Sequence, residues 1–320
     1  MNDAFTDAIN APAGRLAEII LKKLPKAQKG SGLTEDMQAR LDRLVTASGQ
    51  FGMLARVRLA AEVSLLFQQA PQWTKEKIIP FFDWASPDAP AAWAARKYSN
   101  YIGAPELFGL TKQSFLALFT RSDVPEDEVR TFSEWLAAIM LANQYKEADY
   151  PLTPTEARSV LRLAGAKSLS SVARRLALEM EAAKSEEKIS RWREIVGPVF
   201  QNIWPLDIEL QSSQTTFNLV QILRATGKAF PEAADVIIPF VQPDDPRRHS
   251  NVYSISRADD ELYSSSPEKM LDLLTSVVGE PPPKSVYALG KALDRVKAHA
   301  PQLVDTRKFQ KLVSFASAII

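Results

Sequence analysis

The sequence predicts an all-α fold, a curved array of degenerate HEAT-like helical hairpins in the manner of an α-solenoid. Apolar residues recur at helical spacing along most of the 320 residues. Helix start and stop signals repeat through the chain, and the alternation of strand and helix patterns that a parallel sheet requires is absent from the sequence. The composition, 46% hydrophobic and 24% charged, fits a globular protein with a large core.

Three segments of the first half carry the helical pattern. Residues 33–49 begin with Thr34 as an N-cap and end with Gly49 as a stop signal. Residues 52–70 place leucine, valine and alanine on one face, with charged residues between them. Residues 125–147 open with a proline and acidic residues, which suit the first turn of a helix because they lose no hydrogen bond and complement its dipole. We expect a helix over each segment.

The second half repeats the same signals. Residues 152–165 pair Thr153 with Glu156 as a capping box and close with a glycine. Residues 168–204 continue the helical periodicity, and residues 264–280 again run from a serine–proline–glutamate start to a glycine. These patterns predict further helices joined by short loops.

Two short stretches alternate between apolar and polar residues over a few positions. They are residues 205–211 and 251–256, and the second lies in the longest polar part of the chain. This alternation leaves room for one small β-ribbon, with an irregular loop as the alternative.

The tetrapeptide Ile-Ile-Pro-Phe occurs twice, within residues 77–84 and 235–243, and residues 194–205 hold a related proline. A proline inside a helix removes one backbone hydrogen bond and kinks the helix. We expect these prolines to bend the helices of a curved array, the alternative being that each lies in the last turn of an unrelated helix. No short repeat period joins the copies.

The chain is expected to form two helical lobes, residues 1–150 and residues 151–320. The break is expected near residues 149–153 or around residues 205–212, where turn-forming residues interrupt the helical pattern.

Charge and composition exclude several classes of function. The net charge is +1, so the whole chain has no excess of charge to attract nucleic acid or a membrane. The absence of cysteine excludes disulfides, thiolate catalysis and the usual structural zinc sites. The N-terminal residues carry acids where a signal peptide carries basic residues, and no apolar run approaches the length of a membrane span. We expect a cytoplasmic protein with no membrane association.

Catalytic signals are weak. The sequence contains no nucleotide-binding glycine loop, no nucleophile elbow and no zinc-protease motif. With only His249 and His299 in the chain, we expect no metal site and no cofactor. A protein that is not an enzyme is favoured, and an unrecognised carboxylate or histidine site around residues 244–261 is the alternative.

Three groups of residues are candidates for binding. The first is a basic face that would track a phosphate backbone unless its residues pair with acids on the next helix: Arg158, Arg162, Lys167, Arg174 and Arg175. The second is an anion site in a loop, formed by Arg247, Arg248 and His249. The third is a partner groove in the densest aromatic region, formed by Trp84, Trp93 and Tyr98, although tryptophans at helical spacing are more often core residues.

Three further stretches carry a family resemblance. Asn10, Pro12 and Gly14 form an N-x-P-x-G helix start, and two tryptophan–proline segments follow: Trp73, Thr74, Ile79, Pro80, Phe82 and Trp84, then Trp192, Ile203, Trp204 and Pro205. Together they resemble the domain of unknown function that lies C-terminal to sirtuin-like NAD-consuming domains in bacterial anti-phage proteins. That family supplies no catalytic residues to transfer, and no sirtuin-like domain precedes these motifs here.

The resemblance implies a sensor, adaptor or assembly surface, with the effector activity on another polypeptide or on a segment that this chain lacks. The sequence therefore favours a non-enzymatic helical-repeat interaction module with a protein partner, as a sensor or scaffold component of a bacterial antiviral defence system. The alternative is a nucleic-acid-binding helical protein that uses the basic face of residues 158–175.

Overall fold

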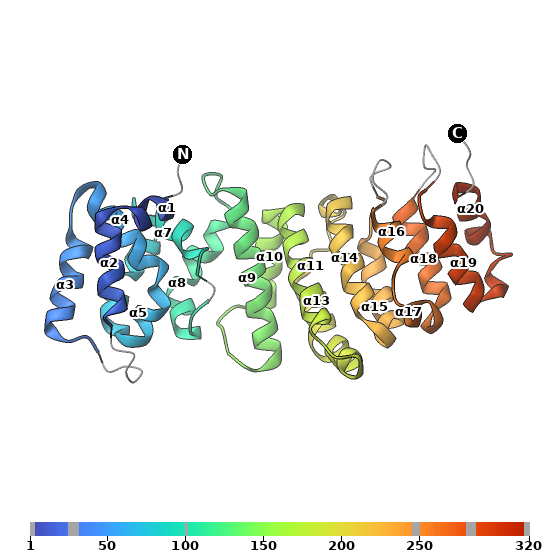
Figure 1. Cartoon of the computed structure of the whole chain (residues 1–320), viewed down its shortest axis with the longest axis horizontal. Coiled ribbons are helices and arrows are strands. Elements are labelled where there is room, and N and C mark those ends of the chain that lie inside the picture. The colour runs from blue at the N-terminus through green and yellow to red at the C-terminus, as the bar shows by residue number, and fades with distance from the viewer. Residues whose placement is uncertain (1–3, 25–31, 100–101, 245–249, 280–285, 317–320) are drawn as a thin grey trace. The chain divides into compact units, whose positions relative to one another are not determined.

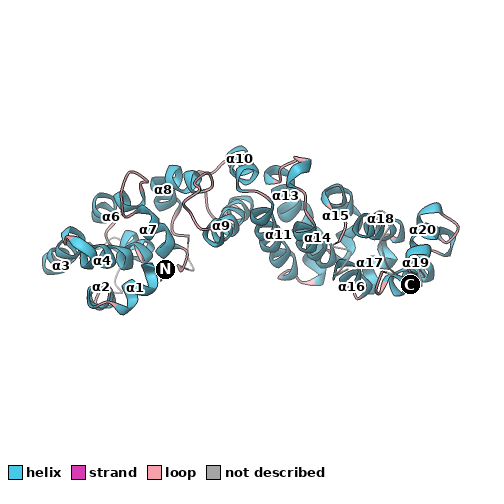
Figure 2. Ribbon diagram, turned by 90° about the horizontal axis from the view of Figure 1, so that it is seen from above, coloured by secondary structure: helices cyan, strands magenta, loops and turns pink. Residues whose placement is uncertain are grey.

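The predicted all-helical fold is confirmed. The computed structural model describes residues 4–24, 32–99, 102–244, 250–279 and 286–316, and these residues contain helices and turns but no strand (Figures 1 and 2). The chain forms two compact units, which we call the N-terminal unit (residues 1–132 and 148–152) and the C-terminal unit (residues 133–147 and 153–320). Each unit is an array of packed helices. Among the described residues, no helix is both long and apolar enough to cross a bilayer.

The N-terminal unit packs its helices around α4. Its helices are α1 (Ala4–Asn10), α2 (Pro12–Lys22), α3 (Glu35–Thr46), α4 (Gly49–Ala61), α5 (Val63–Gln69), α6 (Pro71–Lys77), α7 (Ala89–Arg96) and α8 (Pro105–Leu118), followed by the first part of α9 (Glu126–Tyr145). Helices α1, α2, α3 and α7 all contact α4. Leu54 and Val57 of α4 form a buried cluster with Ala8 of α1 and Ala95 of α7, so hydrophobic burial holds these helices together.

The C-terminal unit stacks its helices in two layers (Figure 2). One layer contains α10 (Pro154–Ala164), α13 (Gly197–Ile203), α15 (Phe230–Ile237), α18 (Pro267–Val278) and α20 (Arg307–Ala316). The other contains the second part of α9, α11 (Ala166–Glu181), α14 (Ser213–Ala225), α16 (Ser250–Ser256), α17 (Asp260–Ser265) and α19 (Leu289–His299). Successive helices alternate between the layers for most of the unit, so each helix buries its apolar stripe against the opposite layer.

Local capping rules place the helix ends where the sequence predicts most of them. Thr34 accepts a hydrogen bond from the backbone N–H of Met37, and Thr153 and Glu156 form the expected capping box. Gly165 ends α10 with a φ of +81°, a left-handed conformation that disfavours other residues. The stop expected at Gly49 is wrong: α3 ends at Thr46, and Gly49 begins α4.

The expected β-ribbon is also wrong. Residues 205–211 contain a single 3₁₀ turn, Ile208–Leu210, and residues 251–256 lie in α16. The reason is visible in the spacing of Val252 and Ile255, which are three residues apart and both fully buried. That spacing places them on one face of a helix, whereas a strand would place them on opposite faces.

Neither Ile-Ile-Pro-Phe copy bends an α-helix from within. In the first copy α6 ends at Lys77 and Pro80 lies in the 3₁₀ turn Ile79–Phe82. In the second copy α15 ends at Ile237 and the 3₁₀ turn Ile238–Phe240 follows. A 3₁₀ turn at a helix end tolerates the missing N–H of proline, because the α-helical bond has already been given up. The tetrapeptide therefore terminates helices, as the alternative interpretation held.

The third proline sits in a different structure. Pro198 follows the π-helical segment Arg191–Val196, which joins α12 (Lys188–Ser190) to α13. A proline at this position cannot donate to the carbonyl oxygen of Glu194, four residues before it. The side chain of Gln144 donates to that oxygen instead, from Nε2 at 2.7 Å. The π-helical turn and Gln144 together accommodate the proline inside a continuous helix.

The residues that carry the family resemblance are packing residues. Gly14 lies so close to α1 that a Cβ atom would stand 1.7 Å from the carbonyl oxygen of Ala8. Trp192 and Trp204 are each 3% exposed, and the Trp204 ring stacks on Phe200 with centroids 4.7 Å apart. These residues hold helices against one another and leave no polar group for chemistry.

Candidate functional site

The two arginines of α10 contact α13 and the segment that follows it. Arg158 donates a hydrogen bond from Nη2 to the carbonyl oxygen of Gln201 at 2.5 Å. Arg162 forms an ion pair with Asp207, with Nη2 and Oδ1 2.6 Å apart. The hydrogen bond to Asp207 raises the pKa of Arg162. Much of the positive charge of α10 is therefore matched within the unit.

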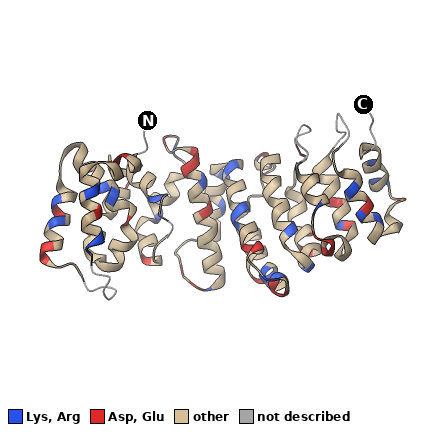
Figure 3. Cartoon of the chain, viewed as in Figure 1, with Lys and Arg blue, Asp and Glu red and all other residues tan. Residues whose placement is uncertain are grey.

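The arginines of α11 also have acidic neighbours. Arg174 Nη1 lies 3.8 Å from Glu134 Oε1 on α9, and Arg175 Nη2 lies 3.1 Å from Glu179 Oε2 on α11 itself. Lys167 is exposed. The basic face that the sequence suggests is thus interleaved with acids, although binding of nucleic acid there stays a prediction (Figure 3).

Glu179 is the centre of a partly buried polar cluster that the sequence did not reveal. Its side chain is 13% exposed and also accepts hydrogen bonds from the hydroxyl of Tyr145 at 2.6 Å and from Nη1 of Arg191 at 2.7 Å. Burial raises the pKa of Tyr145 well above its usual range, and the hydrogen bond to Glu179 adds to this effect. The cluster ties α9, α11 and the π-helical segment together.

A pocket of about 530 Å³ opens beside this cluster. Its walls come from the end of α9 and the π-helical segment: Gln144, Tyr145, Lys146, Glu187, Ser190, Arg191, Glu194 and Ile195. The lining carries both signs of charge, two basic and two acidic residues, so no single class of ligand follows from it. Among the described residues, no group of three or more histidine, aspartate or glutamate side chains is placed to hold a metal ion.

Three strongly exposed aliphatic side chains lie next to the Arg162–Asp207 ion pair. Leu163 follows Arg162 on α10, and Leu206 and Ile208 flank Asp207. They are 65%, 67% and 76% exposed, respectively. We call this set, Leu163, Leu206 and Ile208, the Leu206 patch. Exposed aliphatic side chains grouped in this way are typical of interaction surfaces, whereas single ones are common on any protein.

The residues of the expected aromatic groove do not lie together on a surface. Trp93 is 3% exposed and donates from Nε1 to the carbonyl oxygen of Phe82, so it is a core residue. Trp84 is half-buried beneath the guanidinium of Arg121, whose carbon lies 4.3 Å from the ring centroid. Tyr98 is 47% exposed and stacks on Phe5.

The expected anion site lies outside the described residues, because Arg247, Arg248 and His249 fall between residues 244 and 250. On its N-terminal side, Asp244 is buried and accepts a hydrogen bond from the backbone N–H of Asn251 at 2.9 Å. Asp244 therefore supports the start of α16.

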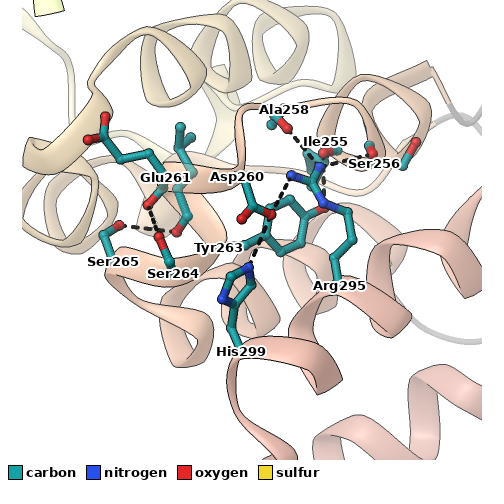
Figure 4. A network of polar contacts seen from close by, with 11 residues as sticks. Ile255, Ser256, Ala258, Asp260, Glu261, Tyr263, Ser264, Ser265, Arg295 and His299 are labelled. Carbon is teal, nitrogen blue, oxygen red and sulfur yellow. Dashed lines mark hydrogen bonds and ion pairs between the residues drawn. The ribbon is translucent and has the colours of Figure 1, made fainter.

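The second histidine belongs to a polar network between α16, α17 and α19 (Figure 4). His299 Nε2 lies 3.0 Å from Asp260 Oδ1, and Arg295 Nη2 lies 3.1 Å from the same oxygen. Arg295 also donates to the carbonyl oxygen of Ala258 at 2.7 Å and covers the buried ring of Tyr263 at 4.0 Å. The hydrogen bonds from His299 and Arg295 lower the pKa of Asp260. Each polar group here holds helix ends together, so the arrangement is structural.

Comparisons with known proteins establish no family. No family model matches the chain. The uncharacterized protein y4cA of Sinorhizobium fredii (strain NBRC 101917 / NGR234) is 24% identical over 97% of this chain, and the chain spans 26% of that protein's length. A crystal structure of an engineered protein aligns over 99% of this chain and 88% of its own, with 15% identity and a TM-score of 0.33, a likeness too low to support any inference.

Proposed function

We propose that this chain is a non-enzymatic helical-repeat interaction module whose C-terminal unit binds a protein partner through the Leu206 patch. The observation that carries the proposal is the exposure of Leu163, Leu206 and Ile208 around one ion pair. Leaving such side chains in water forgoes about 1.5–3 kcal/mol for each one that a partner would bury. This apolar surface is therefore available to a partner.

The surroundings of the patch indicate the chemistry of the partner. Arg162 remains 58% exposed at its side chain although it is paired with Asp207. An apolar centre with a charged rim is the usual anatomy of a protein interface. The partner that fits is a protein segment with aliphatic or aromatic side chains and a carboxylate that reaches Arg162.

The test is a quantitative capture experiment with matched variants. A tagged chain is used to recover partners from its native host, with and without nuclease, and the partners are identified by mass spectrometry. The triple variant Leu163→Ser, Leu206→Ser, Ile208→Ser is compared with wild type and with Phe51→Ser. Phe51 is 67% exposed in the N-terminal unit, which makes it a control for loss of an exposed apolar side chain.

A stoichiometric protein that survives nuclease, is lost with the triple variant and is kept with Phe51→Ser supports the proposal. Each anchor that the partner buries is expected to contribute about 30-fold in affinity. Capture that is equal for all three proteins would contradict the patch as the binding surface.

The resemblance to the sirtuin-associated domain extends the proposal to bacterial antiviral defence, in which the module would act as a sensor or scaffold for an effector on another polypeptide. The similarity to a bacterial protein about four times as long as the matched region is compatible with such a role. Plating of phages on host cells that carry the wild type or the triple variant tests this extension. Equal phage titres on wild-type and deletion strains would overturn the defence role while leaving the partner experiment untouched.

A further inference from the structure

Two arginines of the C-terminal unit have no acidic partner, in contrast to the arginines of α10 and α11. Arg224 on α14 donates from Nη1 to the side-chain oxygens of Gln221 and Ser254, each at 2.9 Å. Arg257, just after α16, donates from Nη1 to the hydroxyl of Tyr253 at 2.7 Å. Within the described part of the chain, neither guanidinium lies within ion-pair distance of a carboxylate. Their positive charge is therefore available to an external anion.

The two arginines belong to one continuous surface. Phe217, Gln221 and Arg224 follow one another at positions i, i+4 and i+7, on one face of α14. Gln221 and Arg224 both contact Ser254 of α16, which connects the two helices. Tyr253 then contacts Arg257 within its own segment. We call Phe217, Gln221, Arg224, Tyr253, Arg257 and Tyr287 the α14–α16 surface.

Exposed aromatic rings accompany these arginines. Tyr253 and Tyr287 stack with ring centroids 5.9 Å apart, although they lie on different segments. Phe217 is 43% exposed, Tyr253 is 41% exposed and Tyr287 is 71% exposed. Rings with faces open to solvent offer stacking positions for other flat groups.

The local charge favours a polyanion. Neither α14, Ser213–Ala225, nor α16, Ser250–Ser256, contains an acidic residue. The ribbon coloured by charge places these helices in the same layer of the unit as α11 (Figure 3). The uncharged side chains between the arginines, such as Gln221, supply further hydrogen-bond donors to anionic oxygens.

We propose that the α14–α16 surface binds single-stranded nucleic acid, with Arg224 and Arg257 on phosphates and the exposed rings of Phe217, Tyr253 and Tyr287 under bases. Charge complementarity selects a polyanion, and the open rings select one that presents flat groups. A duplex keeps its bases stacked inside, and an acidic peptide presents carboxylates without bases, so either one leaves the rings unused. This surface is separate from the Leu206 patch and does not depend on the protein partner.

Fluorescence anisotropy with labelled oligo(dT) and oligo(U) of about 15 nucleotides tests the proposal, because this length covers a typical single-strand site. A duplex of equal length and poly-glutamate are the competing ligands. Wild type is expected to bind the single strands and to lose affinity as salt rises. Competition between oligo(U) and oligo(dT) shows whether RNA or DNA is preferred.

Single substitutions assign the residues. Arg257→Gln is expected to lower the slope of log affinity against log salt by about 0.7, the value for one phosphate contact on a single strand. Tyr253→Ala is expected to weaken binding about tenfold with little change in that slope, because stacking depends weakly on salt. Arg193→Gln, which removes an exposed arginine paired with Glu232, and Phe51→Ala are the matched controls and should bind as wild type does.

Two results would overturn the proposal. One is the absence of binding to both single strands at low salt. The other is binding that poly-glutamate or duplex competes for equally and that Tyr253→Ala leaves unchanged, since this would indicate a surface for acidic proteins or for any polyanion. The triple variant of the Leu206 patch should retain full oligonucleotide binding, so failure of either proposal is recognisable by itself.

Discussion

Replacement of Glu179 by alanine is expected to destabilise the C-terminal unit strongly. Its carboxylate accepts hydrogen bonds from Tyr145, Arg175 and Arg191, and only 13% of the side chain is exposed. Removal leaves Arg191, itself 22% exposed, without its nearest counter-charge. Loss of one member of a buried ion pair costs about 3–5 kcal/mol, and the partial exposure here favours the lower end, about 3 kcal/mol.

A series of substitutions separates the contributions. Tyr145→Phe removes one hydrogen bond to a charged group and keeps the packing of the ring, so we expect a loss of about 1.5 kcal/mol. Glu181→Ala, two residues further along α11, removes an exposed acid and should change the free energy of unfolding by less than about 0.5 kcal/mol.

The assay is urea unfolding, with hydrogen exchange of the α11 peptides measured by mass spectrometry to localise the change. Faster exchange in α11 and in the π-helical segment is expected for Glu179→Ala alone. A free energy of unfolding for Glu179→Ala that equals the value for Glu181→Ala would refute the reasoning, since the carboxylate would then contribute no more than a surface acid.

Three further predictions concern packing and pH. Gly14→Ala should lower the melting temperature through a loss of about 1–3 kcal/mol, because its Cβ would overlap the carbonyl oxygen of Ala8, whereas Gly290→Ala in α19 meets nothing within 4 Å and should raise it by about 0.5–1 kcal/mol. Trp93→Ala should cost about 3–5 kcal/mol in urea unfolding and Trp84→Ala clearly less, and equal losses would contradict the core position of Trp93. The lowered pKa of Asp260 means that its contribution is present above the unfolded pKa of about 3.9 and disappears as the pH falls through the lower folded value; wild type should therefore be more stable than Asp260→Asn at neutral pH, with the two unfolding curves converging below about pH 4.

Local signals in the sequence were sufficient for much of the fold. The Thr153–Glu156 capping box involves residues three positions apart, so its chemistry is complete within one turn of the chain. The pattern over residues 251–256 misled because six residues contain too few apolar positions to separate period two from a helical period. Only the burial of Val252 and Ile255 on one face decides the matter.

The candidate surfaces depend on contacts between distant parts of the chain. Arg162 meets Asp207 across 45 residues, and Glu134 meets Arg174 between two helices. The sequence named the arginines but could not show which of them find acids. It gave no reason to select Arg224 and Arg257, whose distinction is the lack of an acidic neighbour in the described fold. Exposure of Leu206 and Ile208 is likewise a property of the folded chain.

The π-helical segment fixes the number of residues in its helix. Arg191–Val196 contains a wider turn than an α-helix, and the helix continues through Gly197–Ile203 with Phe200 and Ile203 buried. Loss of one residue from this segment would let an ordinary α-helix form, yet it would rotate everything beyond it by about 100°. Phe200 would then turn away from Trp204 and Phe240. A stretch with exposed positions is therefore expected to accept many substitutions in related sequences but no insertion or deletion of a single residue.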